Sequence, residues 1–152
     1  LIKMENWLSE GPFLMYNVDI LTDLEVDQMV KFHQTTNSLV TLAVRNRETS
    51  RYFLFDTNYQ LSGWKNIKSG EMKLIAGKSE DLRPLAFSGI HVVNPEIFKY
   101  KPSEEIFSIV DWYLELAKNH KISGFGHDNS FWLDVGKISK IAAAETYIAR
   151  LK

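Results

Sequence analysis

The chain has 152 residues, of which 45% are hydrophobic and 24% are charged; this length and composition suit a folded domain with a substantial core and argue against disorder. Its 18 lysines and arginines against 19 acidic residues leave a net charge of -1, so no broad basic face is expected to bind nucleic acid through its phosphates. Cysteine is absent, which excludes disulfides, thiolate metal ligands and a thiol nucleophile.

The apolar runs and the first residues bear on location and completeness. No run approaches the ~20 apolar residues of a membrane span, and no signal-peptide pattern opens the sequence. We therefore expect a cytoplasmic protein with no membrane partner. The sequence starts at Leu1, without an initiator methionine, and its first eleven residues, LIKMENWLSEG, read as the end of a helix already under way. We therefore expect a segment before Leu1 to be missing.

A short helix is expected over residues 2–8. It should end before Gly11-Pro12, because both residues resist helix continuation. The residues expected on its inner side are Ile2, Trp7 and Leu8.

The next segments predict a strand, a helix and a strand. Residues 13–18 form an apolar run of strand length, Asp23 is suited to cap a helix over 24–35, and residues 39–44 are β-branched and apolar. One face of this helix is marked at three- and four-residue spacing by Val26, Met29, Val30 and His33. The order predicts a βαβ unit, and therefore parallel pairing through a right-handed crossover.

The middle of the chain predicts an antiparallel meander. Short strand-like segments at 51–55, 61–65 and 73–76 are separated by Asp-Thr-Asn and Ser-Gly sequences that favour turns. We expect residues 51–76 to be a surface insertion on an α/β core.

The last third predicts a strand over 85–93, a short helix opened by Pro95, and a longer helix capped by Ser103-Glu104-Glu105. The inner side of the longer helix is expected to carry Ile106, Ile109, Val110, Tyr113, Leu116 and Ala117.

Two short strands at 121–125 and 131–135 and an alanine-rich helix over 138–151 close the chain. Repeats and Pro/Ser-rich linkers are absent from the sequence, so a single domain spanning residues 1–152 is predicted.

Two aspartates stand at predicted strand ends beside chain reversals. Asp19 follows the strand at 13–18, and Asp134 lies in FWLDVGK before Gly136. Asp19 alone fits a ligand-binding carboxylate at a strand end and a turn residue that caps the loop before Leu24 equally well. Together, the two carboxylates have the composition of a Mg²⁺ site, because Mg²⁺ takes one or two carboxylates and fills its other positions with water and substrate phosphates.

Other candidate motifs are weaker. Gly89 interrupts an apolar strand, which marks either a β-bulge or a close approach by a ligand or another backbone. The four histidines do not cluster along the sequence, and each is interpreted as structural or solvated. No G-x-G-x-x-G or P-loop is present, and no serine has the G-x-S-x-G surround of a hydrolase nucleophile.

Three stretches form a pattern in combination. The first is YNVD at 16–19, which runs on to His33; the second is FSGI at 87–90, followed by NPEIF at 94–98; the third is WLDVG at 132–136, followed by Ala144-Glu145. In this order and approximate spacing they resemble the nucleotidyltransferases that activate sugar 1-phosphates. That group includes mannose-1-phosphate guanylyltransferases and MurNAc-1-phosphate uridylyltransferases.

The resemblance implies a GT-A-like α/β fold, in which a mixed sheet is flanked by helices, with the N-terminal portion absent. Asp19 and Asp134 match the family's metal-binding aspartates, and the metal implied is Mg²⁺. Gly89 matches the glycine whose backbone meets the sugar, and Asn17 and Ser88 fall at the adjoining substrate-binding positions.

The implied reaction joins an NTP and a sugar 1-phosphate into an NDP-sugar and releases pyrophosphate. The Gly-rich loop that cradles the NTP phosphates in this family would lie before Leu1, so we expect this chain to be inactive on its own. We also expect it to associate with itself or with the missing N-terminal segment, because truncation would expose a sheet edge.

Departures from the family pattern keep two alternatives open. Val18 and Lys137 replace a family Gly and Thr, and the Glu-Lys-Pro element of many relatives has no counterpart. A GT-A glycosyltransferase would commonly carry Asp-x-Asp, whereas Asp19 is followed by Asp23. The other alternative is a non-catalytic module that binds a sugar nucleotide or regulates a partner.

Overall fold

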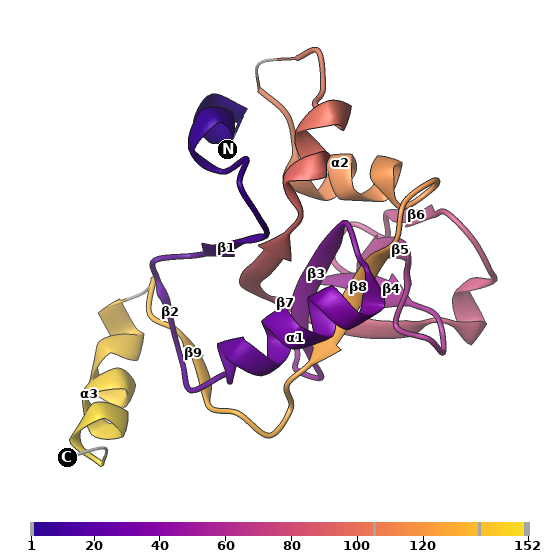
Figure 1. Cartoon of the computed structure of the whole chain (residues 1–152). Coiled ribbons are helices and arrows are strands. Elements are labelled where there is room, and N and C mark those ends of the chain that lie inside the picture. Colours follow the sequence, from indigo (N-terminus) through magenta and orange to yellow (C-terminus); the bar gives the residue numbers. More distant parts are fainter. Residues whose placement is uncertain (1, 105, 137, 151–152) are drawn as a thin grey trace.

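The computed structural model describes residues 2–104, 106–136 and 138–150 and has a mixed sheet flanked by helices (Figure 1), which confirms the predicted fold class. Its strands are β1 (Phe13–Tyr16), β2 (Ile20–Thr22), β3 (Val40–Arg45), β4 (Arg51–Phe55), β5 (Leu61–Asn66), β6 (Met72–Leu74), β7 (Arg83–Val93), β8 (Ile122–Gly126) and β9 (Trp132–Asp134). Its helices are η1 (Ile2–Trp7), α1 (Val26–Thr36), η2 (Ser79–Asp81), η3 (Pro95–Tyr100), α2 (Ile109–Leu116), η4 (Ile138–Lys140) and α3 (Ile141–Ala149), where η marks a 3-10 helix.

The large sheet is built around β7. The strand order is β6-β5-β4-β7-β3-β8, with β1 also paired to β7. The predicted direct parallel pairing of the first two long strands is wrong. β1 and β3 run in the same direction only because each is antiparallel to β7, which lies between them. β3 forms its parallel pair with β8 instead. An apolar pattern identifies a buried strand, but it does not specify the neighbour of that strand.

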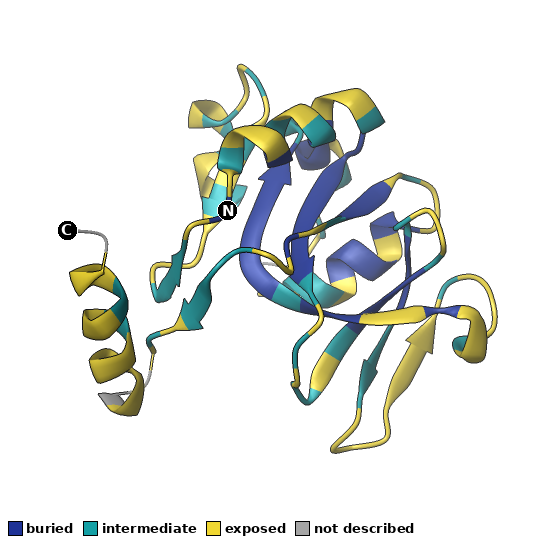
Figure 2. Ribbon diagram, turned by 90° about the horizontal axis from the view of Figure 1, so that it is seen from below, coloured by how far each residue is buried: buried dark blue, intermediate teal, exposed yellow. Residues whose placement is uncertain are grey.

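The sheet is buried on both faces. In β3, Val40, Leu42 and Val44 belong to a large apolar cluster with α2 and η3, whereas Ala43 belongs to a smaller cluster with Met29 of α1. All five side chains have no exposed surface. Figure 2 shows these buried strands at the centre of the molecule, with exposed residues around them. The continuous apolar run at 40–44 therefore reflects two covered faces.

The meander is part of the same sheet. β4, β5 and β6 are antiparallel neighbours, and β4 pairs with the first residues of β7. Phe53, Phe55 and Leu61 are buried in the large apolar cluster. Residues 51–76 thus extend the main sheet and its core, whereas the sequence suggested an insertion on the surface.

The start of the chain departs from two predictions. The first helix is a 3-10 helix that leaves Trp7 82% exposed, although Ile2 and Leu8 pack on the large cluster as expected. Asp23 does not cap α1, whose N-cap is Glu25 without a side-chain bond. Asp23 instead accepts hydrogen bonds from the Phe131 amide (2.7 Å) and from the Tyr147 hydroxyl (3.0 Å). These partners lie more than 100 residues away along the chain, so local patterns give no sign of them.

The second long helix begins later than predicted. Ser108 caps α2 by accepting from the Asp111 amide, so Ile106 stays outside the helix and is 93% exposed. Glu105 of the predicted cap, Lys137 and the predicted helix end at Leu151 lie outside the described residues. In the described ranges, no helix is both long and apolar enough to cross a membrane.

A second, two-stranded sheet pairs β2 with β9 antiparallel, and α3 follows it at the side of the molecule (Figure 1). α3 has no buried residue. It contacts the rest of the protein through Tyr147, whose ring stacks on Phe131 with centroids 3.6 Å apart. The β2–β9 pair is important for the site because it aligns two distant parts of the sequence.

A buried histidine gives the fold a pH-dependent stability. His91 of β7 is 3% exposed, bonds to the Tyr113 hydroxyl (2.8 Å), and has its pKa lowered to about 4 by burial. The unfolded chain takes up this proton near pH 6.5, so it binds more protons than the folded chain between these values. The contribution of His91 to the free energy of unfolding should therefore fall by about 3 kcal/mol as the pH drops from 6.5 to 4.

Urea unfolding followed across this pH range measures the effect. The double variant His91→Phe/Tyr113→Phe removes both polar partners together and should reduce the dependence by this amount, leaving the part that comes from His127, whose pKa burial also lowers to about 4. Tyr113→Phe alone should retain the full dependence. An equally steep dependence in the double variant would exclude His91 as its source.

Candidate functional site

Asp19 and Asp134 lie side by side. The β2–β9 register places Ile20 opposite Asp134, and the Val135 amide donates to the Asp19 carbonyl oxygen (2.8 Å). A Cβ built on Gly136 would lie 2.9 Å from Asp19 Oδ2 and 3.1 Å from Asp134 Oδ1. The two carboxylates therefore border one small space that is open because residue 136 has no side chain.

The space between these carboxylates suits a hard divalent cation. Carboxylate oxygens are the ligands that Mg²⁺ prefers, and one or two of them suffice. No group of three or more His, Asp or Glu side chains with metal-binding geometry occurs within the described ranges. A cation here would thus depend on two protein carboxylates, with its other positions left for water or substrate.

Gly89 forms the β-bulge that the sequence suggested. The β3–β7 register shifts between the pairs Leu42–His91 and Val44–Phe87, and Gly89 has a φ of 80°. A Cβ on Gly89 would lie 3.0 Å from Asn17 Nδ2, and the Asn17 amide donates to the Gly89 carbonyl oxygen (2.9 Å). Two of the three predicted substrate-binding positions, Asn17 and Gly89, are thus in direct contact, and Gly89 is both a bulge and a point of close approach by another backbone.

The bulge also anchors two further segments through its carbonyl oxygens. Arg47 Nη2 donates to the Phe87 carbonyl (2.9 Å), and Trp132 Nε1 donates to the Ser88 carbonyl (2.9 Å). Together with the bond from the Asn17 backbone amide to the Gly89 carbonyl, the three consecutive carbonyls of residues 87–89 each accept a hydrogen bond. Their donors are Arg47 after β3, Trp132 at the start of β9 and Asn17 after β1. The bulge therefore holds Asp19 and Asp134 near each other through their chain neighbours.

The Ser88 hydroxyl points into the interior. Ser88 is fully buried, and its Oγ lies 2.7 Å from His127 Nε2. Ser130 donates its hydroxyl proton to the His127 carbonyl (2.8 Å) and lies 2.7 Å from Nδ1, so Nδ1 carries the ring proton and Nε2 accepts from Ser88. The pair resembles a nucleophile and its base, but a serine without exposed surface cannot meet a substrate with its hydroxyl.

His127 remains neutral near pH 7. Burial and the nearby guanidinium of Arg45 lower the pKa of His127 to about 4, with a smaller contribution from Arg47, against the opposing effects of Asp128 and Asp23. The sequence placed His127 in a loop without a role. Its contacts come from Ser88, 39 residues earlier, and no local pattern signals that pairing.

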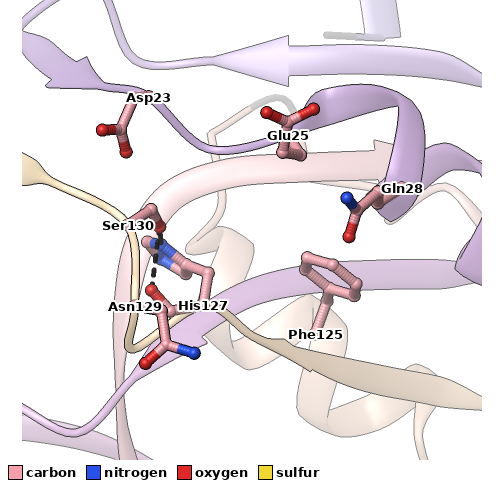
Figure 3. Close-up of a pocket in the computed structure, with 7 residues that line it drawn as sticks. All are labelled: Asp23, Glu25, Gln28, Phe125, His127, Asn129 and Ser130. Carbon is pink, nitrogen blue, oxygen red and sulfur yellow. Dashed lines mark hydrogen bonds between the residues drawn. The ribbon is translucent and has the colours of Figure 1, made fainter.

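A surface pocket of about 320 Å³ adjoins this histidine (Figure 3). Side chains from the start of α1, from β8 and from the loop after β8 line it: Asp23, Glu25, Gln28, Phe125, His127, Asn129 and Ser130. The Asp23 carboxylate already accepts hydrogen bonds from the Phe131 amide and the Tyr147 hydroxyl.

Two arginines that the sequence analysis overlooked lie at the end of β3. The guanidinium of Arg47 lies 4.2 Å from the centroid of the Trp132 ring. Arg45 donates to the carbonyl oxygens of Ser130 (3.2 Å) and Asp128 (3.5 Å). The sequence does contain a signal for these two arginines. Arg45-Asn46-Arg47 directly follows the predicted buried strand at 39–44, and alternate residues of an extended chain point to the same side.

Comparisons with known proteins support the fold. No protein-family model matches the sequence, and no curated protein matches it. Solved structures do match. One is described as a glucose-1-phosphate thymidylyltransferase from Bacillus anthracis in complex with a sucrose. It matches this chain with a TM-score of 0.72 and 14% sequence identity, and the match covers 96% of this chain and 58% of that structure's chain.

Two further structures give the same result. An apo UDP-glucose pyrophosphorylase has a TM-score of 0.70 at 18% identity over 99% of this chain and 59% of its own. HddC from Yersinia pseudotuberculosis has a TM-score of 0.68 at 14% identity over 96% of this chain and 60% of its own. The chain thus shares the fold of these structures and spans about three-fifths of their length.

Replacing Gly89 by alanine tests the bulge. The methyl group would be strained by the positive φ and would crowd Asn17, so we expect a loss of about 1–3 kcal/mol in the free energy of unfolding. Gly126→Ala is the matched control, because its Cβ would meet Tyr59 at 3.7 Å without a positive φ and should cost less than about 0.5 kcal/mol. Equal effects in urea unfolding would contradict the assignment.

Proposed function

We propose that the protein is a sugar-1-phosphate nucleotidyltransferase, and that this chain carries the part that holds the sugar 1-phosphate and Mg²⁺. The observation that carries the proposal is the convergence of Asp19 and Asp134 beside the Gly89 bulge. The fold shared with the three solved structures supports it. Fold alone does not define an activity, so the carboxylate pair provides the chemical argument.

The proposed reaction is a displacement at phosphorus. An oxygen of the sugar 1-phosphate forms a bond to the α-phosphorus of an NTP, and the bond from that phosphorus to pyrophosphate breaks. The products are an NDP-sugar and pyrophosphate, and no oxidant or protein nucleophile takes part. Such a reaction depends on positioning and charge neutralisation, which agrees with a fully buried Ser88 and a His127 that is neutral near pH 7.

Asp19 and Asp134 would hold the metal. Mg²⁺, when bound, neutralises phosphate charge and orients the reacting oxygens. The half-buried Asp19 and the exposed Asp134 keep their carboxylates accessible from solvent, and the Gly136 amide fixes Asp134 by donating to Oδ1 (2.9 Å). Gly89 is buried against the side chains of Asn17 and Ile20, so the exposed Asn17 is the position beside the bulge that a sugar would reach first.

Substituting either carboxylate should abolish activity. The full-length protein with Mg²⁺, an NTP and a sugar 1-phosphate should release pyrophosphate, measured over a panel of bases and sugars. Asp19→Asn and Asp134→Asn should each lower the rate on the order of 10²-fold or more. The same variants should weaken Mn²⁺ binding to residues 1–152, measured by electron paramagnetic resonance.

Asp81→Asn provides the control, because Asp81 is an exposed residue of η2 outside the site. Normal turnover by both site variants would refute the metal assignment. Hydrolysis or transfer from a UDP-sugar without pyrophosphate release would favour a glycosyltransferase, and sugar-nucleotide binding without any turnover would favour a binding module.

We also propose that the chain associates through β1. In the described residues β1 pairs only with β7, and exposed apolar side chains gather along this part of the chain: Met4, Trp7, Leu14, Tyr16 and Val18. An open strand edge with apolar side chains favours pairing with another chain. Residues 1–152 should therefore self-associate as concentration rises, as measured by light scattering.

Leu14→Lys should reduce this association, because a lysine on an edge strand opposes pairing. Leu74→Lys on the edge strand β6 is the matched control, since Leu74 is similarly exposed (46% against 40%). A protein that stays monomeric at all concentrations would overturn the proposal. If Leu74→Lys alone reduced self-association, the contact would be assigned to β6 instead of β1.

A further inference from the structure

Arg47 is the positive charge that lies between the two halves of the candidate site. Its guanidinium covers Trp132, two residues before Asp134, and donates to the Phe87 carbonyl, two residues before Gly89. It is half-buried, and burial and Arg45 lower its pKa while Asp134 raises it. The charge of Arg47 is therefore felt at the proposed metal site, although it makes no contact with Asp134 within 4.0 Å.

Among the described residues, the groups in direct contact with Arg47 carry no negative charge. Throughout the described part of the chain, neither Arg45 nor Arg47 forms an ion pair, and the buried Nε of each has no hydrogen-bond partner. Lysines elsewhere pair with carboxylates, as Lys101 does with Glu5 (2.9 Å). Neutral carbonyls and an aromatic ring hold the two guanidiniums in place without supplying a negative charge.

This arrangement suits a phosphate. A guanidinium presents several donors in a fixed plane that matches phosphate oxygens, and a partly desolvated cation gains more from an anion than an exposed one does. The stacking on Trp132 and the bond to Phe87 restrict the orientation of Arg47 before any ligand arrives. Little conformational freedom would then be lost on binding.

We propose that Arg47 binds the phosphate group of the sugar 1-phosphate and holds it between the Gly89 bulge and the Asp19–Asp134 pair. The inference rests on the proposed function. The sugar 1-phosphate is assigned in preference to the NTP because Arg47 is bonded to the segment that carries Gly89. Arg47 donates hydrogen bonds and keeps its protons throughout; Arg45 adds positive potential without a direct contact.

A purely structural role is the competing explanation. Arg47 joins the end of β3 to β7 and β9 through the Phe87 bond and the Trp132 ring, and under this explanation its loss lowers stability alone. The test therefore separates substrate affinity from folding. It compares Arg47→Lys, which keeps the charge, with Arg47→Gln, which removes it.

Steady-state kinetics of the full-length protein provide the first measurement. Arg47→Gln should raise KM for the sugar 1-phosphate by about 10- to 100-fold, the range for one charge-assisted contact, with KM for the NTP nearly unchanged. Arg47→Lys should fall between it and the unchanged protein. Arg83→Gln is the matched control, since Arg83 also lies over an aromatic ring, Tyr59, about 20 Å along β7 from Gly89.

A binding measurement makes the inference independent of turnover. In residues 1–152 titrated with inorganic phosphate, the side-chain Nε–H signal of Arg47 should shift in proton–nitrogen NMR spectra, and that of Arg83 should not. The Arg47 signal is assigned by its loss in Arg47→Lys.

The outcomes separate the two proposals. An active protein whose Arg47→Gln variant has normal KM values, or an Arg47 signal unmoved by phosphate, overturns the role of Arg47 and leaves the proposed function standing. No pyrophosphate release by the unchanged protein, with a phosphate-dependent Arg47 signal, refutes the nucleotidyltransferase and retains a phosphate site. A variant that only lowers the melting temperature assigns Arg47 a structural role.

Discussion

The β-bulge at Gly89 is the constraint on which the site depends. β7 is buried on both faces and is shared by β4, β3 and β1, so its backbone has little freedom except where the ladder is interrupted. At the interruption, the carbonyl oxygens of residues 87, 88 and 89 accept from Arg47, Trp132 and Asn17. One irregularity in one strand thereby fixes three chain segments that are far apart in the sequence, and a buried carbonyl without such partners would be costly.

Charges of both signs are arranged around this bulge. Asp19 and Asp134 border a common space, and Arg47 lies on the ring of Trp132, two residues before Asp134. The nearby His127 contributes hydrogen bonds and no charge near neutral pH, because burial lowers its pKa to about 4. Carboxylates and a guanidinium around a neutral histidine suit the neutralisation and positioning of phosphates better than proton transfer.

The fold and the chemistry rest on different observations. Identities of 14% to 18% with the solved structures establish a common architecture, and one architecture hosts many activities. The argument for nucleotidyl transfer comes from two carboxylates, a glycine bulge and an unpaired guanidinium on that architecture. The Ser88–His127 pair shows why geometry must accompany residue type: its 2.7 Å contact resembles a catalytic pair, yet Ser88 has no exposed surface.

The sequence by itself determined the positions of the buried strands, the two aspartates at strand ends and the glycine in β7, because apolar periodicity and glycine placement are local properties of the chain. Tertiary structure alone decided that β7 lies between β1 and β3, that Asp23 binds residues 131 and 147, and that Arg47 lies on the ring of Trp132. It also decided that Trp7 and Ile106 are exposed. These features depend on contacts between segments that the folded backbone brings together, and no local pattern encodes which distant segment supplies the partner.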